Sequence, residues 1–218
     1  RVWVSSWGRG IVEVAADTVR RRIDAFSAPG LSATVFNPTD PNFVVVGSVG
    51  IGGGTSWFVN RTAISGNYLA RLVSDTSFVY HTNIATTGQG IFTNMVIDRN
   101  GTKWLANAEP FNKPATALYY FNENNGVSGT QSTGGWGFMT TTDGLPNNNV
   151  LSLAVDLTGD VYVGTDLGLM IITEPTLPKQ RRYTSFPLRE QSVQVIAVDA
   201  VNNKWIGTKE GVFVMNAD

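Results

Sequence analysis

The chain has 218 residues, of which 42% are hydrophobic, and a formal net charge of -1, as expected of an ordinary globular chain with enough apolar residues for a substantial core. Its sixteen Lys and Arg are balanced by seventeen Asp and Glu, so a nucleic-acid partner is not expected. The absence of cysteine excludes disulfides, zinc thiolate sites and cysteine nucleophiles.

The predicted elements, in chain order, are short strands separated by turns. Four apolar runs that end near a turn are expected to be the innermost strands of separate sheets: residues 32–36, 91–97, 150–155 and 193–198. Outer strands are expected at residues 136–140 and 181–185, and arginines 20–22 are expected to be solvated residues of an outer strand. No window shows sustained 3.6-residue periodicity, and 23 Gly with 9 Pro suit a turn-dense, all-β chain.

A repeat organises these strands. Residues 150–169 predict a three-stranded meander, and the spacing of its Asp, aromatic and Gly recurs at residues 199–212 and, in its first half, at 98–106. Weaker copies lie at 40–48 and 3–11. The residue at the aromatic position, which we call the marker, is in turn Trp3, Val45, Trp104, Tyr162 and Trp205. Short strands with a period of roughly 40 to 50 residues are typical of a β-propeller, with one four-stranded antiparallel blade per repeat.

We therefore expect one all-β domain over residues 1–218 with four to five blades. The chain opens and closes inside a repeat, so partial blades at both ends and an excerpt of a larger propeller are expected. Open sheet edges at the partial blades would favour self-association.

The repeated residues have structural roles in this interpretation. The aspartates are expected to accept backbone N–H groups of their own turns, and the aromatic markers to fill the space between blades. The residues concerned are Asp98, Trp104, Asp156, Tyr162, Asp199 and Trp205.

The repeat D-x-x-G-x-x-[WY]-[VI]-G-T-x-x-G-[LV], preceded by Asp143-Gly144-Leu145-Pro146, resembles the two-component regulator propeller repeat. That family includes bacterial sensor ectodomains and PorZ-like proteins of the type IX secretion system. The segment W-V-S-S-W-G-R-G at residues 3–10 is more similar to the PorZ-like variant. The resemblance implies a periplasmic or cell-surface propeller that binds a partner and has no enzymatic activity.

The residues themselves also disfavour catalysis. Propeller glycosidases place acid and base carboxylates on innermost strands, whereas none of the four predicted innermost strands contains Asp or Glu before its terminal turn. The single histidine, His81, has no second His for a metal site and no Ser and Asp for a triad. We expect it to be exposed in a linker over 77–87. Neither metal nor cofactor is expected.

Binding is expected where the chain departs from the repeat, because surface loops on a rigid scaffold carry recognition. Two loops between second and third strands are interpreted as enlarged, at residues 47–56 and 106–116, and a further insertion at 122–135 projects from the opposite face. The predicted ligand contacts are Trp57, Phe111, Lys113, Asp143 and Asn147. An aromatic ring beside a cation and amides suits a peptide or glycan.

Three functions remain open at this stage. The first is an interaction module of the bacterial periplasm or cell surface, linked to type IX protein secretion. The second is the ligand-sensing ectodomain of a two-component regulator. The third is a carbohydrate-active enzyme, which would need carboxylates from blades outside these residues. No apolar run approaches the roughly 20 residues that span a bilayer, so no direct membrane insertion is expected.

Overall fold

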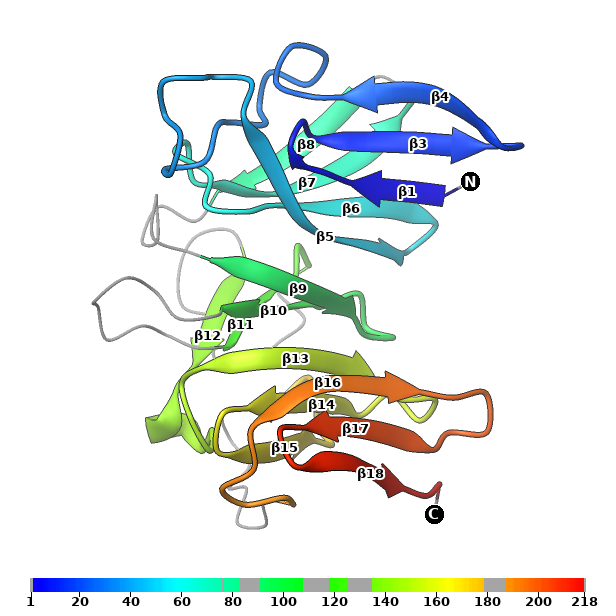
Figure 1. Cartoon of the computed structure of the whole chain (residues 1–218), viewed down its shortest axis with the longest axis vertical. Helices are drawn as coiled ribbons and strands as arrows, with labels where there is room; N and C mark the ends of the chain where they lie inside the picture. The colour runs from blue at the N-terminus through cyan, green and yellow to red at the C-terminus, as the bar shows by residue number, and fades with distance from the viewer. Residues whose placement is uncertain are drawn as a thin grey trace. The chain divides into compact units, whose positions relative to one another are not determined.

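The computed structural model describes residues 2–75, 77–82, 91–107, 118–124, 135–178 and 187–217. These residues form antiparallel strands, turns and one three-residue 3-10 helix, η2 (Thr141–Asp143) (Figure 1). In the part of the chain so described, no helix is long and apolar enough to cross a membrane. The chain divides into two compact units, residues 1–93 and 94–218, and each is described by itself. The single domain expected over residues 1–218 stays a prediction.

The first unit contains two sheets, which we call blades 1 and 2. Blade 1 has the order β1-β3-β4, with strands β1 (Val2–Ser5), β3 (Ile11–Ala15) and β4 (Thr18–Ile23). Blade 2 has the order β2-β5-β6-β7-β8, with strands β2 (Trp7–Gly8), β5 (Val44–Gly52), β6 (Thr55–Asn60), β7 (Asn67–Ser74) and β8 (Ser77–Thr82).

The second unit contains three further sheets, blades 3 to 5, apart from the first two residues of β9. Blade 3 consists of β9 (Phe92–Ile97), β10 (Lys103–Asn107), β11 (Leu118–Phe121) and β12 (Trp136–Met139). Blade 4 consists of β13 (Val150–Val155), β14 (Val161–Thr165) and β15 (Gly168–Ile172). Blade 5 consists of β16 (Val193–Val198), β17 (Lys204–Thr208) and β18 (Gly211–Met215). Five sheets agree with the expected four to five blades.

Within each unit, consecutive blades pack face to face, and we call the packed boundary between two of them a seam. A sheet between two seams must bury both faces, which is why every residue of β14 is buried and its sequence does not alternate. The seam between blades 3 and 4 buries Trp104 and Tyr120 against Leu153 and Val163. Burial raises the pKa of Tyr120 to about 12. In the first unit, the seam between blades 1 and 2 is built around Ile11, Ile23, Val44 and Phe58.

The strand predictions are confirmed in the second unit and partly wrong in the first. Runs 91–97, 150–155 and 193–198 are the first strands of blades 3, 4 and 5, and the outer strand at 136–140 is β12. Run 32–36 is not a strand and contributes a single bridge from Thr34 to Ala63. The supposed loop at 47–56 is strand on both sides of a tight turn, because β5 and β6 pair up to Gly52 and Thr55. The outer strand expected at 181–185 lies outside the described residues.

Candidate binding site

Each repeated aspartate ties together its own turn, as expected. The Oδ1 atom of Asp98 accepts from the backbone N–H groups of Asn100 and Thr102 at 2.8 and 3.0 Å, and its Oδ2 accepts from the indole Nε1 of Trp104 at 2.9 Å. Asp199 repeats this arrangement with its own turn and with Trp205 at 3.0 Å. Each of these aspartates therefore links its turn to the indole of an aromatic marker.

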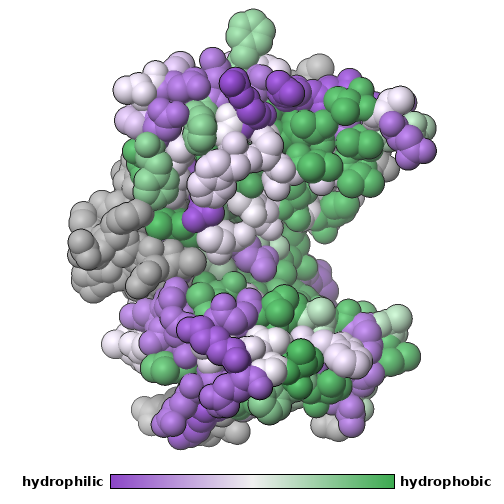
Figure 2. Space-filling model, viewed as in Figure 1, coloured by the Kyte–Doolittle hydropathy of each residue, from purple (hydrophilic) through white to green (hydrophobic). Residues whose placement is uncertain are grey.

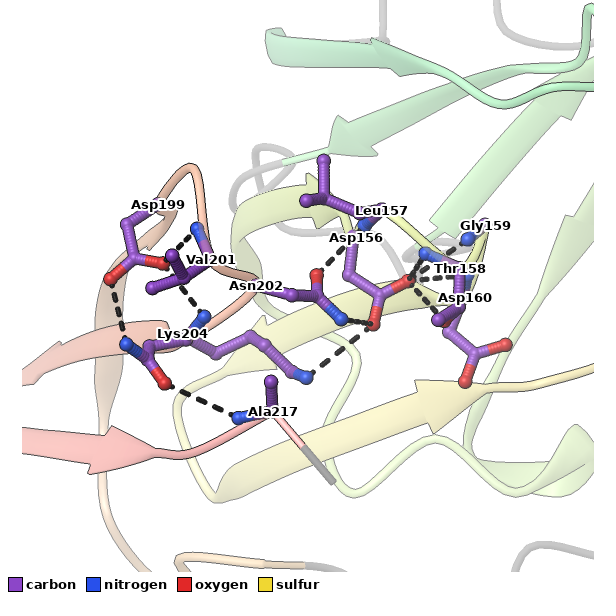
Figure 3. A network of polar contacts seen from close by, with 11 residues as sticks. Asp156, Leu157, Thr158, Gly159, Asp160, Asp199, Val201, Asn202, Lys204 and Ala217 are labelled. Atoms are coloured by element: carbon purple, nitrogen blue, oxygen red, sulfur yellow. Dashed lines mark hydrogen bonds and ion pairs between the residues drawn. The ribbon is translucent and has the colours of Figure 1, made fainter.

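The seam between blades 4 and 5 is closed by a polar network (Figure 3). Asn202 of blade 5 lies at the left-handed turn position, with a φ of 67°. Its side chain donates to Asp156 Oδ2 at 3.4 Å and accepts from the backbone N–H of Leu157 at 2.9 Å, both in blade 4. The buried ammonium of Lys204 lies 3.5 Å from Asp156 Oδ2 and 5.4 Å from the ring centroid of Tyr162. Two side chains of blade 5, Asn202 and Lys204, thus fill this end of the seam.

The charges in that network shift the titration of the aspartate. Burial alone would raise the pKa of Asp156, but hydrogen bonds from Thr158, Asp160 and Asn202 and the charge of Lys204 more than offset it. The pKa of Asp156 therefore lies below its ordinary value. The carboxylate stays ionised and serves as a buried acceptor that joins two blades.

The corresponding end of the seam between blades 1 and 2 has small residues instead. The β5–β6 turn matches the Asp turns in register, because Gly54-Thr55-Ser56-Trp57 aligns with Gly101-Thr102-Lys103-Trp104, and Gly54 and Gly101 have φ values of 74° and 76°. Gly54 then stands where blade 5 has Asn202, and Ser56 where it has Lys204. Ile51 stands in place of the aspartate.

A pocket opens where those larger side chains are missing. Its volume is about 320 Å³, at the lower end of the range of small-ligand sites. The pocket is bounded by the marker of blade 1, the β5–β6 turn and the end of β7, and its lining residues are Trp3, Ile51, Gly54, Thr55, Ser56, Leu72, Val73, Ser74 and Asp75. An indole, aliphatic side chains, hydroxyls and one carboxylate therefore converge on a single opening.

The indole of Trp3 is held in place from several sides. Its Nε1 donates to the Ser56 hydroxyl at 3.0 Å, and its ring meets Phe58 edge to face at 5.1 Å. The guanidinium of Arg21 lies 5.6 Å from the ring centroid. Fixed in this way, the aromatic wall of the pocket is formed before any ligand arrives.

The charges beside the pocket sum to a negative value. Arg21 pairs through Nε with the buried carboxylate of Glu13 at 2.6 Å and lies 3.8 Å from Asp75. Two carboxylates therefore surround one guanidinium. The side chain of Asp75 is largely exposed and lines the opening.

Trp57 lies in a different environment from the one expected. It belongs to β6 and is 1% exposed, with its ring stacked on His81 at 5.4 Å and the guanidinium of Arg71 5.6 Å away. By register Trp57 is the marker of blade 2, and Val45, in the first strand of that meander, is not. His81 lies half-buried in β8 and not in an exposed linker.

Two of the other predicted contacts, Asp143 and Asn147, form hydrogen bonds with nearby backbone groups. The carboxylate of Asp143 accepts from the backbone N–H of Thr140 at 2.9 Å and completes the cap of η2, while Asn147 accepts from the N–H of Asn149 at 2.7 Å. Both side chains organise the segment before β13. Phe111 and Lys113 lie outside the described residues, as does most of the insertion at 122–135.

Two further findings concern catalysis and burial. Among the described residues, no group of three or more His, Asp or Glu could hold a metal ion. Strands β5, β9, β13 and β16 contain no Asp or Glu. Trp104 and Tyr162 are buried as expected, but the prediction is wrong for Trp205, which is 47% exposed.

Comparison with known proteins supports the fold. No protein-family model matches the chain, and no curated protein matches it. Among solved structures, it is similar to PorZ, a surface component of the type IX secretion system of Porphyromonas gingivalis, with a TM-score of 0.74 and 18% identity over 98% of this chain and 30% of that one. The chain has a β-propeller fold. At this identity, the likeness shows the fold alone.

Two further structures complete this picture. The extracellular domain of the hybrid two-component system BT3049 of B. thetaiotaomicron aligns with a TM-score of 0.65 and 16% identity over 99% of this chain and 26% of that one. Virginiamycin B lyase of Staphylococcus aureus aligns with a TM-score of 0.52 and 12% identity over 79% and 55%. This chain spans less than a third of PorZ and of the BT3049 domain.

Proposed function

We propose that this chain is a non-catalytic binding module of a bacterial periplasmic or cell-surface protein, and that it binds a protein or glycan ligand at the pocket between blades 1 and 2. The observation that carries the proposal is the departure of this seam from the repeat. Gly54 and Ser56 replace the side chains that close the equivalent seam, and the space is bounded by a fixed indole and an exposed carboxylate.

Chemistry at the pocket suits recognition better than reaction. Trp3 offers a flat apolar wall, Ser56 and Thr55 offer hydroxyls, and Asp75 is the carboxylate at the opening. An acid and base pair for hydrolysis would need two carboxyl groups facing one bond. Here the second carboxylate, Glu13, is buried in its pair with Arg21, which supports a binding role.

The likeness to PorZ favours a role in type IX protein secretion for the whole protein. The likeness to extracellular domains of two-component systems favours a second candidate, a sensor ectodomain. The two candidates make different predictions in cells. Loss of a secretion component should leave exported proteins inside the envelope, whereas loss of a sensor should abolish a transcriptional response to the ligand and leave secretion intact.

The pocket is tested by a substitution that introduces the side chain found at the same position in other blades. Ser56→Lys introduces the residue that blades 3 and 5 carry at this position and should fill the space beside Trp3. The indole N–H resonance of Trp3, followed by NMR during titration with short peptides and neutral oligosaccharides, should move with one class of ligand in the wild type and with neither in the variant.

The matched control is Lys204→Ser, which makes the reverse change in the seam between blades 4 and 5. It should leave the response of Trp3 unchanged. The pocket is not the binding site if the Trp3 resonance does not shift with either class of ligand. The same conclusion follows if the Ser56→Lys protein responds as the wild type does.

A further inference from the structure

Trp7 lies at the tip of the hairpin that joins β1 to β3, and this tip is attached to blade 2. The backbone N–H and the hydroxyl of Ser6 both donate to the carbonyl oxygen of Gly10, at 2.9 and 3.0 Å. Gly10 donates in turn to the carbonyl oxygen of Val44 at 3.0 Å, and Trp7 pairs with Val45 of β5. The tip therefore holds the indole of Trp7 in a defined position between blades 1 and 2.

The guanidinium of Arg61 lies against this indole. Arg61 directly follows β6, and its backbone N–H donates to the carbonyl oxygen of Val45 at 2.8 Å, so Trp7 and Arg61 are neighbours of the same residue of β5. The Cζ atom of Arg61 lies 5.0 Å from the centroid of the Trp7 ring, which is the distance of a cation–π contact. Trp7 is 67% exposed, so the pair is open to a ligand from solvent.

Arg61 has no anionic partner in the part of the chain that the structure describes. Its buried Nε atom makes no hydrogen bond, and burial is the only cause that lowers the pKa of this half-buried side chain. A guanidinium nevertheless stays protonated in proteins. The cost of removing this charge from water is therefore not offset by a protein carboxylate. A carboxylate from a ligand would offset it with charge-assisted hydrogen bonds.

The backbone next to Arg61 is held in a strained conformation. Thr62 has a φ of 52°, which is unusual for a β-branched residue. Its buried hydroxyl is hydrogen-bonded to the hydroxyl of Thr34 and donates to the carbonyl oxygen of Arg61 at 2.7 Å. Strain of this kind persists only where the surrounding structure enforces it, and it is frequent at ligand-binding positions. The main chain that carries Arg61 is thus fixed before a ligand binds.

The hydroxyl groups beside the pair favour a peptide over an acidic sugar. The Ser6 hydroxyl bonds to Gly10 and accepts from the backbone N–H of Arg9 at 3.1 Å, and the Thr62 hydroxyl is used as described above. An acidic sugar would bring several hydroxyls that need partners of their own. An acidic side chain brings a carboxylate for the guanidinium and methylene groups for the indole.

We propose that Trp7 and Arg61 form a second binding site, which takes a carboxylate side chain from an acidic peptide segment of a protein partner. The guanidinium pairs with the carboxylate, and the indole contacts the methylene groups of the same side chain. This site is separate from the pocket. Arg61 follows one end of β6, whereas Thr55 and Ser56 of the pocket lie at the other end.

The probes are the peptide acetyl-Gly-Glu-Gly-amide and its neutral counterpart with glutamine in place of glutamate. In NMR titrations of the 218-residue chain, the indole N–H resonance of Trp7 should shift with the glutamate peptide. The same shift should require at least about tenfold more of the glutamine peptide, which lacks the charge. Ser56→Lys, which fills the pocket, should leave the response of Trp7 unchanged, so failure of one site is distinguishable from failure of the other.

Arg61→Met removes the charge and keeps a long side chain beside the indole. In this variant the preference of the Trp7 resonance for the glutamate peptide should disappear. The matched control is Arg20→Met, which removes an exposed guanidinium from β4, where Figure 2 shows hydrophilic side chains at the surface. It should respond to both peptides as the wild type does.

The proposal is overturned if the Trp7 resonance does not shift with the glutamate peptide, or if both peptides act at the same concentration. It is also overturned if Arg20→Met weakens the response as much as Arg61→Met, because general attraction by positive charge would then explain it. An equal response to sodium glucuronate would assign the site to acidic sugars and contradict the peptide assignment. The comparison of the two peptides uses the wild-type chain, so it decides the proposal even if Arg61→Met does not fold.

Discussion

Trp104 and Asp98 are joined by a buried hydrogen bond of 2.9 Å between the indole Nε1 and Oδ2, while the other carboxylate oxygen holds the backbone of the turn between them. Replacing Asp98 by Ala leaves a buried indole N–H and the N–H of Thr102 without acceptors. We expect the free energy of unfolding, measured in urea, to fall by at least about 2 kcal/mol.

Asp199→Ala is the natural control for that change. Asp199 makes the same contacts with its turn and with Trp205, but its surroundings are open to water, which can replace the lost acceptor. The loss of stability should therefore be clearly smaller than for Asp98→Ala. Equal losses would mean that burial does not set the strength of this motif.

The same motif predicts a pH effect at Asp199. The indole N–H of Trp205 and further hydrogen bonds from Asn203 and Val201 lower the pKa of Asp199 to about 2. Because this pKa lies below the ordinary value of 3.8, the stabilisation is complete above about pH 4 and is lost as the pH falls towards 2. NMR titration of the carboxyl carbon should show this pKa, and Trp205→Phe should raise it. A value near 3.8 in the wild type would contradict the assignment.

Trp57 is expected to be a stability residue. Sequence analysis places it on the ligand surface, where its removal should leave the melting temperature almost unchanged. In the structure it is buried against His81 and Arg71, so Trp57→Ala should lower the free energy of unfolding by about 3–5 kcal/mol. Trp7→Ala, at an exposed indole, should cost less than about 1 kcal/mol. Similar denaturation midpoints for the two variants would contradict the burial of Trp57.

The fold could be predicted where the repeat is carried by local chemistry. An aspartate, a left-handed turn residue and an aromatic at fixed spacing specify the same hairpin at Asp98, Asp156 and Asp199, whatever surrounds it. Blade 2 lacks the aspartate because Ile51 stands there. Sequence analysis therefore assigned the marker position of blade 2 to Val45 and not to Trp57, although Gly54-Thr55-Ser56-Trp57 keeps the rest of the pattern.

The proposed site and the exposure of Trp205 depend on packing between blades, which local patterns do not specify. Trp3 was recognised as a marker, but only the register of blade 2 shows that small residues face it. Trp205 carries the same pattern as Trp104 and is nevertheless exposed, because no described blade covers it. Residues 51 and 54–56 of the loop predicted from departures from the repeat line the proposed pocket.

Asn202 provides the most direct test of how the seam between blades 4 and 5 is closed. Its φ of 67° suits glycine at least as well as asparagine, so Asn202→Gly keeps the turn and removes only the side-chain contacts with Leu157 and Asp156. The free energy of unfolding should fall by about 1 kcal/mol, and amide hydrogen exchange at Leu157 should accelerate. The control is Gly101→Asn, at the matching turn, where an added Cβ meets open space. It should not change hydrogen exchange at Leu157 or the contacts in the seam between blades 4 and 5. Unchanged exchange at Leu157 in the Asn202→Gly protein would show that apolar packing alone closes the seam.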